Sequence, residues 1–159
     1  MLLNHYKAFL EKHMQGKPSS LLNEEGGTAT FTNLVYQKAE AMLPMLMHQT
    51  GEIIVGSDNT AETGASYGLK KKITSGLNLA LVRSMTDNDD GSHSSVMVAT
   101  YTNTSSEAIT IGEVGLKGNV KLSGSSATTS IVLDRTPLGT PLTIQPGEVG
   151  RIVYTITMA

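Results

Sequence analysis

The stretch that decides the fold is the C-terminal one, LDRTPLGTPLTIQPGEVGRIVYTITMA, residues 133–159. Apolar and polar side chains alternate along its last part, as expected of a strand with one buried face. The two faces hold Ile152, Tyr154 and Ile156 on one side and Val153, Thr155 and Thr157 on the other. Before this strand, Pro146 presets φ and Gly147 tolerates a positive φ, the combination that a type II turn requires. The stretch therefore predicts two strands, TPLTI and GRIVYTITM, joined by a tight turn.

The same period of two continues upstream to about residue 51. It is seen in KKKITSGLNLALVRSM (70–85), SSVMVATYTNT (94–104), EAITIGEVGLKGNVKL (107–122) and TSIVLDRT (129–136), and EIIVGS (52–57) is predicted to be a buried strand. About seven or eight short strands separated by polar turns are typical of an all-β domain. We therefore predict a mainly β protein, an antiparallel β-sandwich that is Ig-like or jelly-roll-like, over residues 51–159.

The N-terminal segment MLLNHYKAFLEKHMQGK has a different, helical period. Leu3, Tyr6, Phe9 and Leu10 recur at helical spacing and form an apolar face, which predicts an amphipathic helix over residues 2–14. Such a short helix is marginal in water, so it either packs on its own domain or docks on a neighbouring subunit. We divide the chain into residues 1–50, an N-terminal helix and extended arm with assembly contacts, and residues 51–159.

The rest of the arm has two parts. KPSSLLNEEGGTAT, residues 17–30, is predicted to be a turn-rich connection. Further on, Met42, Met45 and Met47 surround Pro44 in an apolar run that is either a core strand, a broken helix or an adaptable interface, because thioether side chains repack readily. The candidate assembly residues are thus Leu3, Tyr6, Phe9, Leu10, Met42, Met45 and Met47.

Composition restricts the kind of partner and of chemistry. Twelve Lys and Arg against 14 Asp and Glu leave a formal charge of −2, which does not suggest a field that attracts nucleic acid. No cysteine is present, which excludes disulfides and thiolate chemistry. The N-terminus lacks the unbroken apolar run of a signal peptide, and no run reaches the about 18 apolar residues of a membrane span. We expect a soluble protein without nucleic-acid or membrane partners.

No pattern of a catalytic or metal site is complete. TDNDDGSH, residues 86–93, is rich in oxygen ligands, but a calcium loop with Gly91 at its sixth position would have Met97 where the bidentate Glu belongs. A looser calcium site with Asp87, Asp89 and Asp90 stays open beside a solvated hairpin tip. The four histidines are scattered, and GASYG at 64–68 does not match a nucleophile elbow. We predict no catalytic residue, metal or cofactor, and therefore no enzyme.

Three charged features have structural interpretations. The basic run LKKKI, residues 69–73, is interpreted as a solvated strand or one that protects a sheet edge. Glu113 lies in an apolar segment, and Arg135 follows an apolar strand. If both side chains point inward they can form a salt bridge that fixes the strand register, and if not they are two unrelated exposed charges.

Three segments together resemble a known family. They are IIVGSDNTAETGASYGLKKKI (53–73), YTNTSSEAITIGEVGLKGNV (101–120) and IVLDRTPLGTPLTIQPGEVGRIVYTI (131–156). In this order they resemble small β-sandwich structural proteins in the virions of tailed bacteriophages, and the likeness covers roughly residues 53–157. The family's loop before the tyrosine usually carries a proline and an acidic residue, whereas this chain has Gly64, Ala65 and Ser66.

The resemblance implies a non-enzymatic structural subunit of a phage virion, in the neck, the tail or a capsid decoration. Such a subunit is expected to be made in the cytoplasm of a bacterial host, to form a homo-oligomer and to contact other virion proteins. The alternative is a carbohydrate- or host-surface-binding β-sandwich module of a phage fibre, which would need aromatic side chains exposed in loops. The chain has five Tyr, two Phe and no Trp.

Overall fold

The computed structural model describes residues 19–31, 51–63, 66–87, 89, 93–121 and 128–158. This described part of the chain is mainly β and contains no helix. Its strands are β1 Ser19–Leu22, β2 Thr28–Phe31, β3 Glu52–Gly56, β4 Leu77–Asp87, β5 His93–Asn103, β6 Ile109–Lys121, β7 Thr128–Ile144 and β8 Val149–Met158. The predicted helix over residues 2–14 and the methionine-rich run around Pro44 lie outside the described residues.

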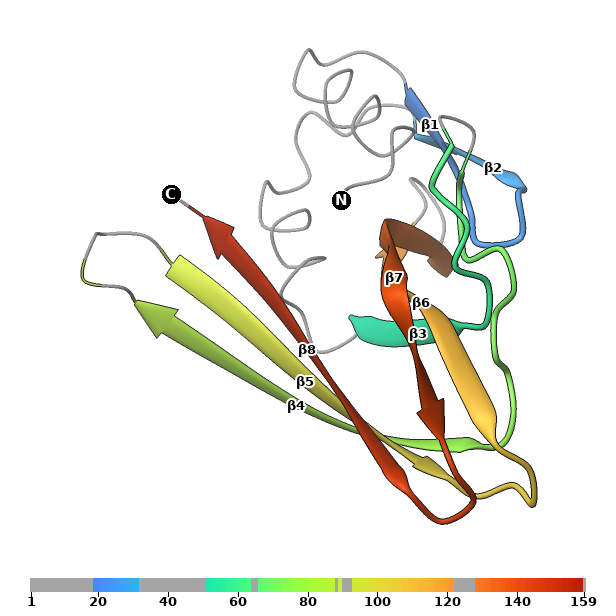
Figure 1. Cartoon of the computed structure of the whole chain (residues 1–159). Coiled ribbons are helices and arrows are strands. Elements are labelled where there is room, and N and C mark those ends of the chain that lie inside the picture. The colour runs from blue at the N-terminus through green and yellow to red at the C-terminus, as the bar shows by residue number, and fades with distance from the viewer. Residues whose placement is uncertain are drawn as a thin grey trace.

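The strands form a hairpin and two larger sheets, all antiparallel. β1 pairs with β2, and the larger sheets have the orders β3–β6–β7 and β4–β5–β8. Figure 1 shows these two sheets close together at the end where β7 turns into β8 and wider apart toward the tip of the β4–β5 hairpin. The prediction of a mainly β, antiparallel protein is therefore confirmed.

The chain crosses from one larger sheet to the other at three connections, β3 to β4, β5 to β6 and β7 to β8. The predicted tight turn at Pro146 is present, because Gly147 has a φ of 79° and the Glu148 N–H donates to the Gln145 carbonyl over 2.9 Å. The strands that it joins lie in different sheets, so they do not form a hairpin. Turn residues determine where the chain reverses direction, but they do not determine with which strand the following strand pairs.

The hydrophobic core is shared by both larger sheets. Odd-numbered side chains of β5 point into it, among them Met97, Ala99 and Tyr101. Val96, Val98 and Thr100 therefore occupy the outer face of that sheet. On β8, Ile152, Tyr154 and Ile156 pack against the core whereas Val153 is exposed, which confirms the predicted alternation. The other main core residues are Ile53, Val55, Ile111, Val114, Leu116, Ile131, Leu133 and Ile144.

Residues 19–31 are the β1–β2 hairpin rather than an irregular connection, and this hairpin is bonded to the β3–β6–β7 sheet. The Glu24 N–H donates to the Ser130 carbonyl over 3.1 Å. The Glu24 carboxylate also contacts the ammonium groups of Lys72 at 2.9 Å and Lys117 at 3.8 Å. Partly exposed ion pairs of this kind contribute at most about 1 kcal/mol each. The hairpin is thus tied to the sheet by several weak contacts.

Candidate functional site

The most concentrated polar cluster surrounds Glu113 of β6. Its side chain is completely buried, and its carboxylate accepts hydrogen bonds from the backbone N–H groups of Lys70 at 3.2 Å and Lys71 at 2.8 Å. Gly56 of β3 faces the same carboxylate, and a Cβ there would overlap it and lie 2.7 Å from the Lys71 carbonyl oxygen. The glycine is therefore needed for the close approach of three chain segments.

Arg135 of β7 completes the cluster and is also fully buried. Its Nε donates to Glu113 Oε2 over 2.6 Å. Its Nη2 points to the loop after β3, where the Thr60 carbonyl lies at 3.1 Å and Asp58 Oδ1 at 3.5 Å. The structure therefore brings the two charges that the sequence singled out into contact, although through one Nε bond and not bidentately.

The loop after β3 carries further polar groups of this cluster. Thr60 donates to the Asp58 carboxylate through its hydroxyl at 2.6 Å and its N–H at 2.8 Å. These bonds, followed by the charges of Lys70 and Arg135, hold the pKa of Asp58 below its ordinary value. The Lys70 ammonium in turn donates to the Thr60 hydroxyl and to the Ala61 carbonyl. Two carboxylates and two cations thus balance each other in this cluster.

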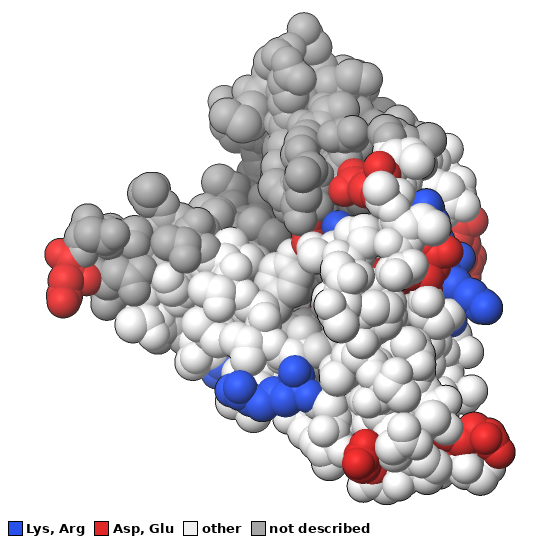
Figure 2. Space-filling view, viewed as in Figure 1, with Lys and Arg blue, Asp and Glu red and all other residues white. Residues whose placement is uncertain are grey.

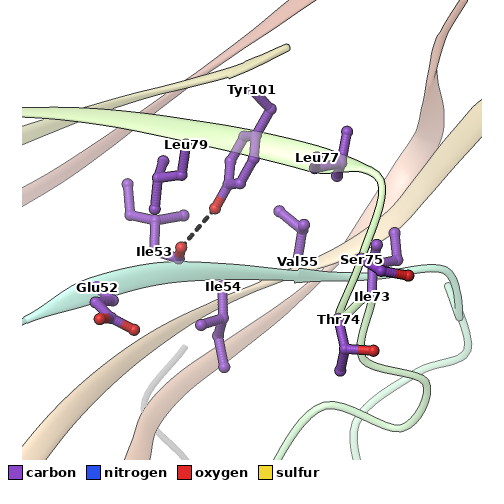
Figure 3. Close-up of a pocket in the computed structure, with 10 residues that line it drawn as sticks. All are labelled: Glu52, Ile53, Ile54, Val55, Ile73, Thr74, Ser75, Leu77, Leu79 and Tyr101. Carbon is purple, nitrogen blue, oxygen red and sulfur yellow. Dashed lines mark hydrogen bonds between the residues drawn. The ribbon is translucent and has the colours of Figure 1, made fainter. Parts of the chain in front are cut away.

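Two tyrosines connect the sheets through their hydroxyl groups. Tyr101 of β5 donates to the Ile53 carbonyl of β3, as Figure 3 shows, and Tyr154 of β8 donates to the Asp134 carboxylate of β7. Burial, the larger effect in both, raises the pKa of each hydroxyl, and the Asp134 carboxylate raises that of Tyr154 further. Both hydroxyls are therefore held in their neutral, donating form.

Asn103, at the end of β5, organises the end of the molecule where the chain crosses between sheets. Its side chain is 1% exposed. Its Nδ2 donates to the carbonyls of Glu107 and Ile144, each at 2.8 Å, and its Oδ1 accepts from the Ser105 N–H at 2.9 Å. Its backbone N–H donates to the Glu148 carbonyl and its carbonyl accepts from the Gly147 N–H. One residue thus ties two of the crossing connections, β5 to β6 and β7 to β8, together.

This arrangement supports structure rather than catalysis. Glu113 and Arg135 are each 0% exposed, and the Glu113 carboxylate already accepts three hydrogen bonds. A general base must reach its substrate, directly or through one water molecule. Among the described residues, no group of three or more His, Asp and Glu is placed to hold a metal ion. The cluster is therefore suited to holding strands in register.

Two surface hollows border the outer strands of the β4–β5–β8 sheet. One, of about 140 Å³, lies between β4 and β3 and is lined by Ile53, Val55, Ile73, Leu77, Leu79 and Tyr101 among others. Figure 3 shows these side chains facing each other across the space between the two strands. The second, of about 290 Å³, lies between β8 and β7, and its lining includes the polar residues Asp134, Thr136 and Thr155. Each hollow occurs where the edges of the two sheets part.

The other residues singled out in the sequence are distributed as follows. The candidate assembly residues lie outside the described residues, namely Leu3, Tyr6, Phe9, Leu10, Met42, Met45 and Met47. In the acidic tip, Asp89 is exposed and Asp90 is not among the described residues. In the basic run, Lys72 forms an isolated bridge with Gly56, so this segment lies along the edge of β3.

Charged side chains are scattered on the described part of the face that Figure 2 shows. Figure 2 shows Lys, Arg, Asp and Glu in small groups of both signs on the face in view, with wide uncharged areas between them. No helix among the described residues is long and apolar enough to cross a membrane. No protein-family model, curated protein or solved structure matches the chain.

Proposed function

We propose that the chain is a β-sandwich structural subunit of a tailed-bacteriophage virion, located in the neck, the tail or on the capsid, and that it acts by assembling with copies of itself and with other virion proteins. It would have no catalytic activity and no cofactor. It would be made in the cytoplasm of a bacterial host and end in the particle.

The observation that carries the proposal is the position of the residues that produce the family resemblance. Two of the three matching segments supply Asn103, Glu113, Asp134 and Arg135, and all four are buried. Their side chains bond to one another's strands and loops, although Asp134 also borders the hollow between β8 and β7. The residues that carry the resemblance therefore form an internal framework, as expected of a structural subunit.

We also propose that residues 1–50 supply assembly contacts, as the apolar face of the predicted helix and the methionine-rich run suggest. The β1–β2 hairpin is bonded to the two-sheet core, so a truncation should end before Ser19 and leave this hairpin in place. A chain without residues 1–18 is expected to stay folded and to lose the contacts between subunits that the N-terminus makes, so that it no longer forms the full-size assembly. Multimers of full size from the truncated chain would contradict this role of the N-terminus.

The function is tested by negative-stain electron microscopy of the purified full chain. Closed particles with rotational symmetry are expected of a subunit that makes one repeated contact. Dispersed single copies that bind sugars on a glycan array would instead favour the fibre-module alternative. Tyr67, a loop residue 39% exposed, is the described aromatic side chain that suits this alternative, and Tyr67→Ala should abolish any sugar binding.

A further inference from the structure

Each larger sheet has two edge strands, and the four edges differ in how they are protected from pairing with another chain. β3 is covered where Ser57 N–H donates to the Lys71 carbonyl and Ile73 N–H donates to the Val55 carbonyl. β7 contains Pro137 and Pro141, and its register with β6 is broken twice. Prolines, bulges and covering segments are the devices that keep sheet edges from pairing. Both edges of the β3–β6–β7 sheet are thus protected.

β4 lacks these devices. Its sequence LNLALVRSMTD contains no Pro and no Lys, and its register with β5 is unbroken from Leu77 to Asp87. Among the described strands it pairs only with β5, and Figure 1 shows it at the rim of its sheet. Leu79 is 38% exposed and Val82 66%. A long, regular, apolar edge of this kind is a template for another strand.

The backbone groups on the free edge of β4 can be assigned from its neighbour. Asn103 directs its N–H and C=O toward the β8 side, and Thr104 directs its N–H to the Gly76 carbonyl on the β4 side. Because these directions alternate along a strand, even-numbered residues of β4 bond to β5. The N–H and C=O groups of Leu77, Leu79, Leu81 and Arg83 therefore point to the free edge.

The side chains of the same residues face the inner side of the sheet. Leu77 and Leu79 line the hollow of about 140 Å³ between β4 and β3. Arg83 is the one charged residue of this part of β4, and its guanidinium already donates to the Gly51 carbonyl. The free edge from Leu77 to Val82 thus carries no charge and offers backbone hydrogen-bonding groups. It lies beside a hollow whose lining combines apolar side chains with the polar residues Glu52, Thr74 and Ser75.

β8, the opposite edge of the same sheet, is less suited to pairing. Arg151 is one of the residues whose backbone groups point to its free edge, and it is exposed. The hollow beside β8 contains Asp134, which already accepts the Tyr154 hydroxyl. A strand added at β8 would bring apolar side chains against these polar groups, at an energetic cost.

We propose that β4 is an assembly edge, at which two copies of the chain pair their β4 strands antiparallel about a twofold axis at Ala80. This deepens the proposed function, because it names one contact by which copies of the subunit join. The pairing places Leu79 opposite the partner's Leu81, and Leu77 opposite the partner's Arg83. The leucines of both copies then meet at the two inner hollows, and the two sheets become one.

A second copy fits this edge for two reasons. An edge without charge has no electrostatic preference for a different partner, whereas an antiparallel pair of identical strands satisfies the same backbone groups on both sides. In addition, side chains approach most closely in a non-hydrogen-bonded pair, with about 4.5 Å between Cα atoms, and the axis puts the small Ala80 at that position. The two Arg83 side chains lie at opposite ends of the paired segment.

Disulfide trapping tests the pairing directly, because the full chain contains no cysteine. Ala80→Cys introduces one thiol at the axis, where the expected separation permits a disulfide. After mild oxidation nearly all of this variant should run at twice the monomer mass without reductant, and at the monomer mass with it. Thermal melting followed by circular dichroism checks that Ala80→Cys, a small change at an exposed position, leaves the fold intact.

Two matched variants complete the test. Thr100→Cys lies on the same outer face next to Ala80, but one strand further from the axis, where two copies would be about 15 Å apart. It should stay monomeric on oxidation. Val153→Cys reports pairing through β8 instead. Trapping of Val153→Cys without Ala80→Cys, or equal trapping of all three, would overturn the proposal. Absence of any trapping in a chain that still assembles would reject the β4 pairing alone and leave the proposed function standing.

Discussion

Replacing Glu113 by Gln removes one charge from the buried cluster while keeping the size of the side chain. The carboxylate accepts from Lys70 N–H, Lys71 N–H and Arg135 Nε. An amide has one oxygen to accept these bonds, and its NH2 group would face an N–H donor. Arg135, which is 0% exposed, would keep its charge with only the Thr60 carbonyl at 3.1 Å and Asp58 at 3.5 Å as partners.

The expected loss follows from the burial of both partners. Removing one member of a buried ion pair typically costs about 3–5 kcal/mol, because the other charge stays in a medium that solvates it poorly. That is a large fraction of the about 5–15 kcal/mol by which a domain is stable. For a chain of this length the melting temperature should fall by roughly 10–15 °C.

Urea unfolding followed by circular dichroism measures this loss. Glu107→Gln, at an exposed loop position, is the matched control and should change the free energy of unfolding by less than about 0.5 kcal/mol. The double variant Glu113→Gln with Arg135→Met leaves no unpaired charge. Its loss of unfolding free energy should therefore be clearly smaller than the sum of the losses in the two single variants. A loss below about 1 kcal/mol for Glu113→Gln, or strict additivity in the double variant, would refute the role given to this pair.

Three further substitutions test other parts of the framework. Asn103→Ala leaves the Glu107 and Ile144 carbonyls and the Ser105 N–H without their partner and should cost about 2–4 kcal/mol in urea unfolding, whereas exposed Asn78→Ala should be nearly neutral. Gly56→Ala forces a Cβ against Glu113 and the Lys71 carbonyl and should lower the melting temperature. Gly139→Ala, with nothing within 4 Å of the added Cβ, should leave it unchanged. Equal melting temperatures of the two variants would contradict the close packing around Gly56. Burial raises the pKa of Tyr154, so its contribution to stability is complete below the ordinary pKa of about 10 and is lost as the pH rises above that value. Between about pH 10 and 11 the free energy of unfolding should therefore fall less steeply in Tyr154→Phe than in the unchanged chain. Identical slopes would show that this hydroxyl is not buried against Asp134.

The alternation of side chains was sufficient to predict the strands but not their arrangement in sheets. In β8 the period of two separated the two faces, of which the one with Ile152 packs on the core, and Pro146 with Gly147 identified the turn. The sequence could not show that this turn crosses between sheets, because pairing is decided by contacts between residues far apart in the chain. The β1–β2 hairpin was missed since its four-residue strands are too short for the alternation to be recognised.

The polar framework was only partly visible in the sequence. Glu113 and Arg135 could be singled out because each charge interrupts an apolar run. Tyr101 and Asn103 have the same parity as Met97 and Ala99 in β5, so their burial followed from the alternation once the inner face was known. Their partners, the Ile53 and Ile144 carbonyls, are backbone groups on other strands, which no residue pattern identifies.

The most direct test of the central claim, that this chain works by assembling copies of itself, is its mass in solution measured by light scattering over a range of concentrations. We expect a defined multiple of the 16.9 kDa chain mass. A mass of 16.9 kDa at every concentration would contradict it.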